Sequence, residues 1–317
     1  MPKPRHQLVD VEATPYYHCM SRVVRRAFLC GRDPLTGSSF DHRKLWIAER
    51  MQELVEIFAA GICAYGLMSN HFHLILCIDP ARARSWSDKE VAHRYRRLFR
   101  HTVEDAELLP AKARAHKVRL WRERLSSLSW FMRCLNESIA RRANQEDDCT
   151  GRFWEGRFRS QALLDEGALL TCMAYVDLNP IRAGLAARPE DALFTSIRER
   201  LLKGTRAAAP GLVPFTEQAQ GKEESLPVRF DDYLEIVRFA AKAIRTEKAV
   251  AVPAAVATRL ERHALDSSSF IDTLRNYPRR FFTMVGSVHR IDTESTRRGY
   301  KRRPGIGGAR RMYRNTG

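Results

Sequence analysis

The sequence has no Cys-x-x-Cys pair and no apolar run approaching the roughly 20 residues that a membrane-spanning helix needs. Its seven cysteines are odd in number and scattered, which argues against a disulfide framework and against a structural zinc knuckle. The N-terminus, MPKPRHQLVD, has no apolar core of the kind found in secretory signals. These absences predict a protein of the reducing cytoplasm.

Acidic residues are scarce relative to basic ones. The chain of 317 residues has 37 Asp and Glu against 54 Lys and Arg, for a formal net charge of +17. A surplus of this size favours a polyanionic partner, usually a nucleic acid. Residues 297–317 hold eight basic and no acidic side chains, and the rest of the chain still carries +9. The body of the protein is therefore basic as well as its tail.

Hydrophobic patterning predicts strands and helices in a mixed order. The segments that carry it are 15–24 (strand), 41–60 (helix), 62–68 and 71–78 (strands), 126–144 (helix), 151–163 (loop or strand) and 165–185 (helix interrupted or ended by Pro180). A charged, helical stretch fills about 80–127. Scattered Gly, Pro and polar residues then predict a linker at 201–230, before a helical region at 231–317.

Two histidines stand one residue apart in the apolar run GLMSNHFHLILCIDP, residues 66–80. In a strand, His71 and His73 project to the same side, while Phe72 and Leu74 point the other way. Two neutral imidazoles that converge from one strand make half of a metal site. The alternative is structural, with one histidine hydrogen-bonded in the core and the other half exposed.

A second candidate group lies in the segment MAYVDLNPIRAGL. If a helix continues through it, Tyr175 and Asn179 are four residues apart and share one face. A phenol beside a metal-bound phosphate can attack phosphorus, and an Asn carbonyl can complete a hard-cation site with the two histidines. The alternative is a buried tyrosine followed by an Asn-Pro helix stop.

Four blocks of the sequence together resemble a known family. GLMSNHFHLIL and YVDLNPIRAGL are similar to the His-hydrophobic-His strand and the tyrosine helix of single-tyrosine HUH transposases, in their REP-associated tyrosine transposase branch. YYHCMSRVVRRAFL and GRFWEGRFRS resemble that branch's first strand and its Trp-Arg-Phe segment. The blocks occur in the family's order and cover roughly 15–78 and 150–186.

The resemblance implies an α+β fold with a ferredoxin-like (RRM-like) antiparallel sheet and helices on one face. To this the sequence adds a helical insertion at about 80–127 and a helical C-terminal extension. We therefore expect a transposase-like catalytic domain at 1–200, a linker at 201–230 and a helical accessory region with a basic tail at 231–317.

The resemblance also implies a mechanism. His71 and His73, with Asn179 as third ligand, would hold Mg²⁺ or Mn²⁺, and Tyr175 would cleave single-stranded DNA beside a hairpin through a 5′-phosphotyrosine intermediate. The protein would then be a single-strand DNA endonuclease and strand transferase, as a monomer or a homodimer. The alternatives are a catalytically silent DNA-hairpin-binding regulator on the same fold and a metal-dependent phosphodiesterase with water as nucleophile.

Further residues near these blocks are expected to contact DNA. They are Arg22, Asn70, Arg152, Trp154, Arg157, Arg159 and Arg182. Five arginines around one site favour phosphate contact over mere solubility. For Asn70 a role in the tight turn is the alternative, and for Trp154 a place in the core. His18, in the first strand, is interpreted as structural.

Overall fold

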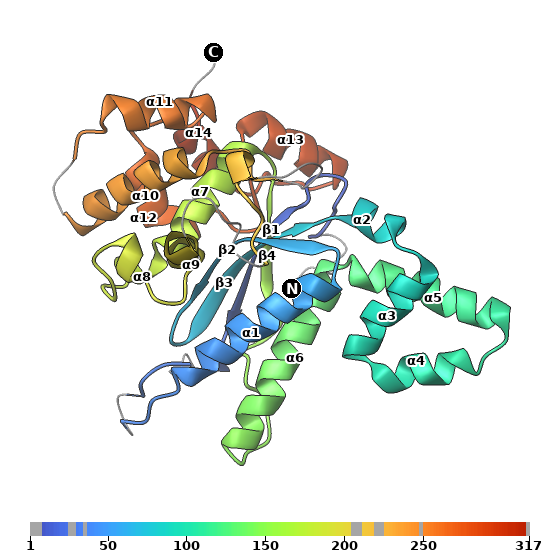
Figure 1. Cartoon of the computed structure of the whole chain (residues 1–317). Helices are drawn as coiled ribbons and strands as arrows, with labels where there is room; N and C mark the ends of the chain where they lie inside the picture. Colours follow the sequence, from blue (N-terminus) through green and yellow to red (C-terminus); the bar gives the residue numbers. More distant parts are fainter. Residues whose placement is uncertain are drawn as a thin grey trace.

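The structure is a computed structural model that describes residues 8–24, 30–33, 37–203, 211–218, 225–246 and 250–314. Five strands form one sheet: β1 (Tyr16–Arg22), β2 (Ala60–Leu67), β3 (His71–Ile78), β4 (Arg159–Leu163) and β5 (Met284–Val285). The helices through the tyrosine segment are α1 (His42–Ile57), α2 (Pro80–Ser85), α3 (Asp88–Leu98), α4 (Arg100–Glu107), α5 (Ala111–Leu125), α6 (Leu128–Glu146), α7 (Glu166–Asp177) and α8 (Asn179–Arg182) (Figure 1).

After α8, the regular elements of the described residues are helices, with β5 as the exception. These helices are η3 (Pro189–Asp191), α9 (Ser196–Lys203), η4 (Thr216–Gln218), α10 (Phe230–Arg245), α11 (Ala254–Arg262), α12 (Phe270–Arg280), α13 (Val288–Arg297) and α14 (Ile306–Met312). Within the described residues, no helix is long and apolar enough to cross a membrane.

The first four strands have the ferredoxin-like order. The sheet runs β2-β3-β1-β4-β5, and the chain order through β4 is strand, helix, strand, strand, helix, strand, with the insertion before α6. β1 pairs antiparallel with both β3 and β4, and β2 pairs antiparallel with β3. β5 adds a short parallel edge beside β4. The predicted α+β class, the antiparallel ferredoxin-like arrangement and the helical insertion and extension are therefore confirmed.

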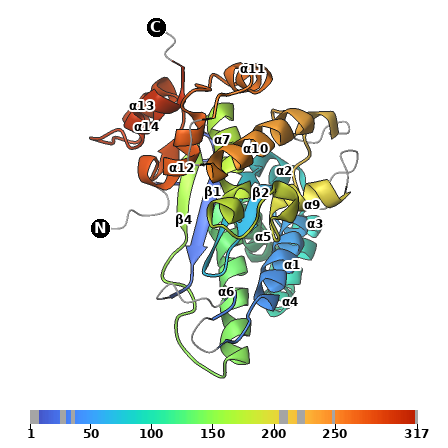
Figure 2. The ribbon, with the colours of Figure 1, turned by 90° about the vertical axis from the view of Figure 1, so that its left-hand side faces the viewer.

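Helices cover both faces of the sheet. α1 and α6 pack together on one face, where Asn136 of α6 bonds with Ser21 of β1 and accepts a hydrogen bond from the Trp154 indole. The expectation of helices on one face holds for this pair. α7 lies on the opposite face. There the backbone carbonyl of Val176 is so close to Gly66 of β2 that a Cβ added to this glycine would lie 3.0 Å from the carbonyl oxygen. Figures 1 and 2 show α10–α14 gathered around α7, away from α1 and α6.

The tyrosine helix α7 is buried along its whole length, from Gly167 to Asp177. A helix that is apolar all round needs cover on its outer side, and here α10 and α12 supply it. At its N-terminus, the Asp165 carboxylate caps Ala168 N at 2.9 Å and accepts bonds from Ser287 N, at 2.7 Å, and from the Tyr313 hydroxyl. The C-terminal region is thus bonded directly to the start of this helix.

The C-terminal end of α7 is fixed by a buried carboxylate. Asp177 is 1% exposed and accepts hydrogen bonds from the Ser196 hydroxyl (2.6 Å), Ile197 N (3.0 Å) and the Tyr233 hydroxyl (2.5 Å). Burial raises the pKa of Asp177, and these donors act in the opposite direction. The network ties α7 to α9 and α10, so both ends of the helix are anchored to later parts of the chain.

The predicted element boundaries agree closely with the structure. The 41–60 helix is α1, the strand pair is β2 and β3, and the helix after Asp165 ends at Asp177, with Pro180 inside the short α8. Segment 151–163 is a loop followed by β4. Residues 204–210 and 219–224 of the predicted linker, and 25–29 of the first matching block, lie outside the described residues. Phe215 and Leu226, which flank the second of these gaps, are fully buried. The division into domains stays a prediction.

Candidate active site

His71 and His73 lie on the face of the sheet that α7 covers. Their ring centroids are 5.0 Å apart, with the rings nearly perpendicular. His73 is 2% exposed, whereas His71 at the start of β3 is part-buried. The register places His73 opposite Met20 and Gly66, in the centre of the sheet. The prediction that both imidazoles project to the same side is therefore confirmed.

A chain of hydrogen bonds fixes the orientation of His73. Its Nδ1 lies 2.8 Å from Nε2 of His18, whose own Nδ1 lies 3.3 Å from Oε1 of Gln161. The Tyr277 hydroxyl donates to the same Gln161 oxygen at 2.8 Å. Because that oxygen only accepts, the consistent assignment has His18 Nδ1–H donating to it and His73 Nδ1–H donating to His18. Nε2 of His73 is then left with its lone pair.

His71 is held in the same way by its neighbour. Its Nδ1 lies 2.6 Å from Oδ1 of Asn70, so the ring donates through Nδ1, and Nε2 carries a lone pair. Within the described residues, no protein hydrogen bond involves Nε2 of either ring. Metal-ligating histidines typically donate their other ring N–H to an oxygen or nitrogen acceptor in this manner. Asn70 thus has a contact, to His71, that neither reading of the sequence anticipated.

Tyr175 comes to the histidines from α7. Its ring centroid is 5.5 Å from that of His73 and 6.2 Å from that of His18. On the side of the C-terminal helices, Tyr277 of α12 stacks on it at 4.5 Å, with 20° between the planes. The Arg182 guanidinium lies 4.6 Å from the centre of the Tyr175 ring. Tyr175 is therefore 5% exposed, and a single chain brings it to His73 and His18.

Asn179, at the start of α8 and four residues after Tyr175, has an unsatisfied side-chain amide. Its Nδ2 is buried and has no hydrogen-bond partner in the described part of the chain. Since the two amide atoms can be interchanged by a flip, the amide group as a whole is short of a partner. Two imidazole lone pairs and this amide are a donor set that suits a divalent cation. Among the described residues, no group of three or more His, Cys, Asp and Glu side chains is placed to hold a metal ion, and this includes His18, His71 and His73.

Burial keeps the histidines neutral. Removal from water lowers the pKa of His18 and of His71 to about 4, with the Arg22 charge adding to the effect on His71. Burial also lowers the pKa of His73 well below its ordinary value, helped by His18 and His71. Neutral imidazoles are the form that binds metals. Burial raises the pKa of Tyr175 as well, whereas Arg182 acts to lower it, so the phenol keeps its proton at neutral pH.

The buried histidines predict an acid-sensitive stability. Above pH 6.5 His18 is neutral in both folded and unfolded chains, but below it only the unfolded chain takes up the proton. Between pH 6.5 and 5 the free energy of unfolding should fall by about 2 kcal/mol from His18 alone, at 1.36 kcal/mol per pH unit. Thermal unfolding in EDTA at both pH values would measure this. His18→Gln should reduce the pH dependence by about this amount, since His71 and His73 still contribute. The exposed-site control His289→Gln should leave the dependence intact, and equal slopes in all three proteins would contradict the assignment.

The arginines predicted to bind DNA divide into groups. Arg159 lines the same hollow of about 130 Å³ as His18, His73 and Tyr175. Arg22 and Arg157 join Arg159 in an adjoining hollow of about 210 Å³, and Arg182 lies on Tyr175 itself. Arg152 lies farther away, in a third hollow beside α6. The first four are thus brought together around the candidate site.

Trp154 is placed in the core. It is 9% exposed, its ring centroid lies 5.6 Å from that of Phe72 and 4.8 Å from that of Phe153, and its indole N–H donates to the Asn136 carbonyl. This environment favours the packing role over base stacking.

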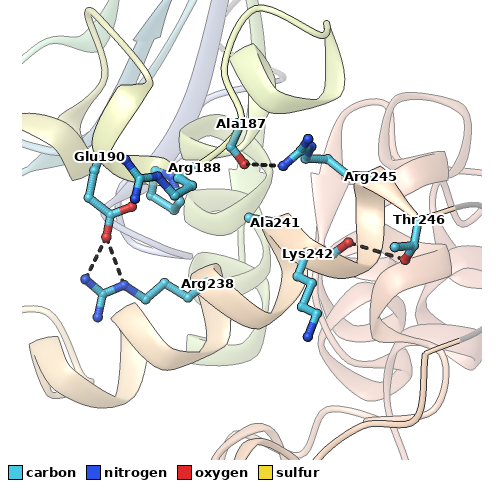
Figure 3. A pocket seen from close by; sticks show the side chains of 9 residues that line it. Ala187, Arg188, Glu190, Arg238, Ala241, Lys242, Arg245 and Thr246 are labelled. Atoms are coloured by element: carbon cyan, nitrogen blue, oxygen red, sulfur yellow. Dashed lines mark hydrogen bonds and ion pairs between the residues drawn. The ribbon is translucent and has the colours of Figure 1, made fainter.

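A separate hollow of about 620 Å³ lies between η3 and α10 (Figure 3). It is also basic, but its arginines have protein partners. Arg238 donates twice to Glu190, at 2.6 and 3.0 Å, and Arg245 donates to the Ala187 carbonyl at 3.4 Å. In Figure 3 Lys242 points away from Glu190. No histidine or tyrosine lines this hollow, so it has no groups for the chemistry of the Tyr175 site.

Two residues of the site were not predicted from the sequence. Gln161 and Tyr277 are 116 residues apart, and neither belongs to a motif. The only local signal is that Gln161 sits in β4 two residues after Arg159. His18, interpreted as structural, is in direct contact with His73.

Comparison with known proteins adds little to this geometry. No family model and no curated protein matches the chain. A search of solved structures returns the structure of the REP-associated tyrosine transposase bound to a REP hairpin, at a TM-score of 0.39 and 10% identity. The match covers 72% of this chain and 99% of that one. A likeness at this level decides neither fold nor function, and both have to be argued from the residues of this chain.

Proposed function

We propose that this protein is a metal-dependent single-strand DNA endonuclease and strand transferase that uses Tyr175 as its nucleophile. The observation that carries the proposal is the meeting of Tyr175 with His73 and His18 in one hollow, with Arg182 over its ring. Neutral histidines, a partnerless Asn179 amide and a buried phenol form a set that phosphoryl transfer can use. The motif resemblance supplies the substrate class, single-stranded DNA beside a hairpin.

In this proposal the cation site comprises Nε2 of His71, Nε2 of His73 and the Asn179 amide. When bound, Mg²⁺ or Mn²⁺ supplies Lewis-acid polarisation of the scissile phosphate. The Tyr175 oxygen attacks phosphorus, the bond from phosphorus to the 3′-oxygen breaks, and the phenol proton ends on the released 3′-hydroxyl. The products are a 5′-phosphotyrosine and a free 3′-OH. Because one phosphodiester replaces another, attack by a different 3′-OH can rejoin strands without an external energy source.

The surrounding arginines would stabilise negative charge at the site and position the DNA. Arg182 lies over the Tyr175 ring, where a guanidinium favours the charge that develops on the phenolic oxygen. Arg22, Arg157 and Arg159 line the hollows beside the histidines, where they would contact phosphates. The contact between Tyr175 and His73 within one chain supports a site built by a monomer.

The test is a search for the covalent intermediate. Purified protein would be incubated with end-labelled single-stranded hairpin DNA in Mn²⁺ or in EDTA, digested, and analysed by mass spectrometry for a nucleotide on the peptide that contains Tyr175. We expect a metal-dependent adduct on Tyr175. Cleavage without an adduct would indicate water as nucleophile, and binding without either would indicate the silent regulator, so each of these results would overturn the proposal.

A further inference from the structure

We propose that a single-stranded flank of the DNA leaves the Tyr175 hollow along a groove that passes round the start of β4 and ends on α6 beside Trp130. This rests on the proposed function and extends the same site. It also gives the helical insertion a part in substrate binding, through Arg124 of α5, which lies over the Trp130 ring.

Three hollows follow one another and share residues. The Tyr175 hollow, of about 130 Å³, shares Met20 and Arg159 with the next, of about 210 Å³. That one shares Gly156 and Arg157 with a third, of about 660 Å³, lined along α6 by Ser129, Met132, Arg133 and Asn136. The groove therefore starts on the face that α7 covers and finishes on the face of α1 and α6.

Of the five arginines that line this groove, only Arg133 has a carboxylate partner among the described residues, Glu137 at 2.8 Å. Within the described residues, Arg22, Arg152, Arg157 and Arg159 form no ion pair. Several arginines elsewhere on the described surface do form ion pairs, for example Arg97 with Glu56 at 2.8 Å, Arg303 with Asp292 at 2.6 Å and Arg238 with Glu190 at 2.6 Å. The acidic residues in the groove are Glu155 and Glu137, and Glu137 already accepts from Arg133 and Arg141. Unpaired guanidinium groups along a continuous hollow favour a phosphodiester backbone.

Arg133, which lines the far end of the groove, lies beside an aromatic residue, Trp130, that a second arginine also contacts. Trp130 is half-buried on α6, and the guanidinium groups of Arg133 and Arg124 lie 5.0 and 4.3 Å from its ring centre. Arg133 lines the groove and is 57% exposed, so it can move from the indole to a phosphate. Arg124 comes from α5 of the insertion and donates to the Tyr95 hydroxyl at 2.7 Å. An aromatic side chain with arginines at the end of a basic groove is a pattern that binds single strands by stacking and charge.

The path of the groove favours a single strand over a duplex. To follow it, the nucleic acid must turn from one face of the sheet to the other within the width of one domain. Duplex DNA has a persistence length of about 50 nm and does not bend over so short a distance without a large cost. A single strand does so readily. The hairpin stem therefore lies outside this groove, and the unpaired flank lies in it.

The test compares hairpin oligonucleotides that end near the cleavage site with ones extended by ten unpaired nucleotides on the 5′ or the 3′ side. Dissociation constants would be measured in EDTA, where no cleavage occurs, at several salt concentrations. For wild type, one of the two extensions should tighten binding about tenfold or more. The groove variant Arg152→Ala/Arg157→Ala, which removes two arginines without carboxylate partners among the described residues, should lose most of that gain and lower the salt slope by about 1, at roughly 0.7 per phosphate contact.

The matched control is Arg238→Ala/Arg303→Ala, which removes the same charge from arginines that already have carboxylate partners. It should keep the gain. Trp130→Ala, with its melting temperature checked, should reduce the gain by about tenfold through lost stacking. Equal gains in groove and control variants, no gain in wild type, or the same gain with a double-stranded extension would overturn the inference. Because binding is measured without cleavage, it can succeed or fail independently of the Tyr175 adduct.

Discussion

Tyr175→Phe is expected to abolish the covalent protein–DNA adduct and to lower metal-dependent strand cleavage by at least about a thousandfold, because it removes the attacking oxygen and nothing else. The phenyl ring can keep its stacking on Tyr277 at 4.5 Å, its edge contact with His73 and the guanidinium of Arg182. Affinity for uncleaved hairpin DNA should change by less than a few-fold. A denaturing gel with labelled DNA would measure the adduct, and filter binding in EDTA the affinity.

The chain offers a matched control in the same hollow. Tyr277→Phe also removes one hydroxyl from the stacked pair, but this hydroxyl bonds to Gln161 and lies away from the attack in the proposed mechanism. We expect Tyr277→Phe to keep the adduct, with a rate within about a hundredfold of wild type. An adduct that survives in Tyr175→Phe, or is lost only in Tyr277→Phe, would show that Tyr175 is not the nucleophile and would refute the mechanism.

His73→Gln should produce the second large effect, a loss of at least about a hundredfold in Mn²⁺ affinity together with loss of cleavage. Glutamine has a similar reach and retains a hydrogen-bonding group for His18, but it lacks the imidazole lone pair on Nε2. The measurement is Mn²⁺ titration by electron paramagnetic resonance without DNA, so that cation binding is read separately from catalysis.

Comparing two variants would distinguish the proposed metal ligand, His73, from the residue that positions it, His18. His18→Gln leaves His73 in place but replaces the ring nitrogen that accepts its Nδ1–H by a flexible amide, so a loss of about 10- to 100-fold in Mn²⁺ affinity is expected. Nitrogen NMR of the metal-free protein should also show His73 changing its protonated nitrogen in this variant. If Mn²⁺ affinity were the same in wild type, His18→Gln and His73→Gln, the cation would be held elsewhere.

Much of the central sheet could be predicted from the sequence because its signals are local. Alternation along 71–78 places both histidines on one side, and the helix after Asp165 follows from its cap and its apolar run. Even the break near Pro180 is a property of the residues at that point. These predictions depend on neighbours within a few positions, and the structure agrees with them.

The rest of the site depends on contacts over long distances in the chain. Nothing near Tyr277 indicates that it stacks on a tyrosine 102 positions earlier, and nothing near Gln161 indicates its bond to His18. The sequence does indicate that α7 is enclosed. The helix has apolar or small residues on every side, so it must be covered on the side away from the sheet as well as on the side that faces it. That pattern predicts a cover without saying which segment supplies it. Likewise, an arginine in the sequence shows its charge but not whether a carboxylate will neutralise it.

The cover of α7 has a consequence for the order in which the protein is made. Asp165 at the start of the helix is bonded to Tyr313, 148 residues later, and Asp10 to Arg297, 287 residues later. A ribosome releases the N-terminal strands first, and the emerging α7 has an apolar outer side with no partner until α10 and α12 follow. Tyr175 therefore reaches its final surroundings only after α10 and α12 have been made. A nascent or truncated chain that lacks these helices can have both histidines in place and still lack the packing that positions Tyr175 beside them.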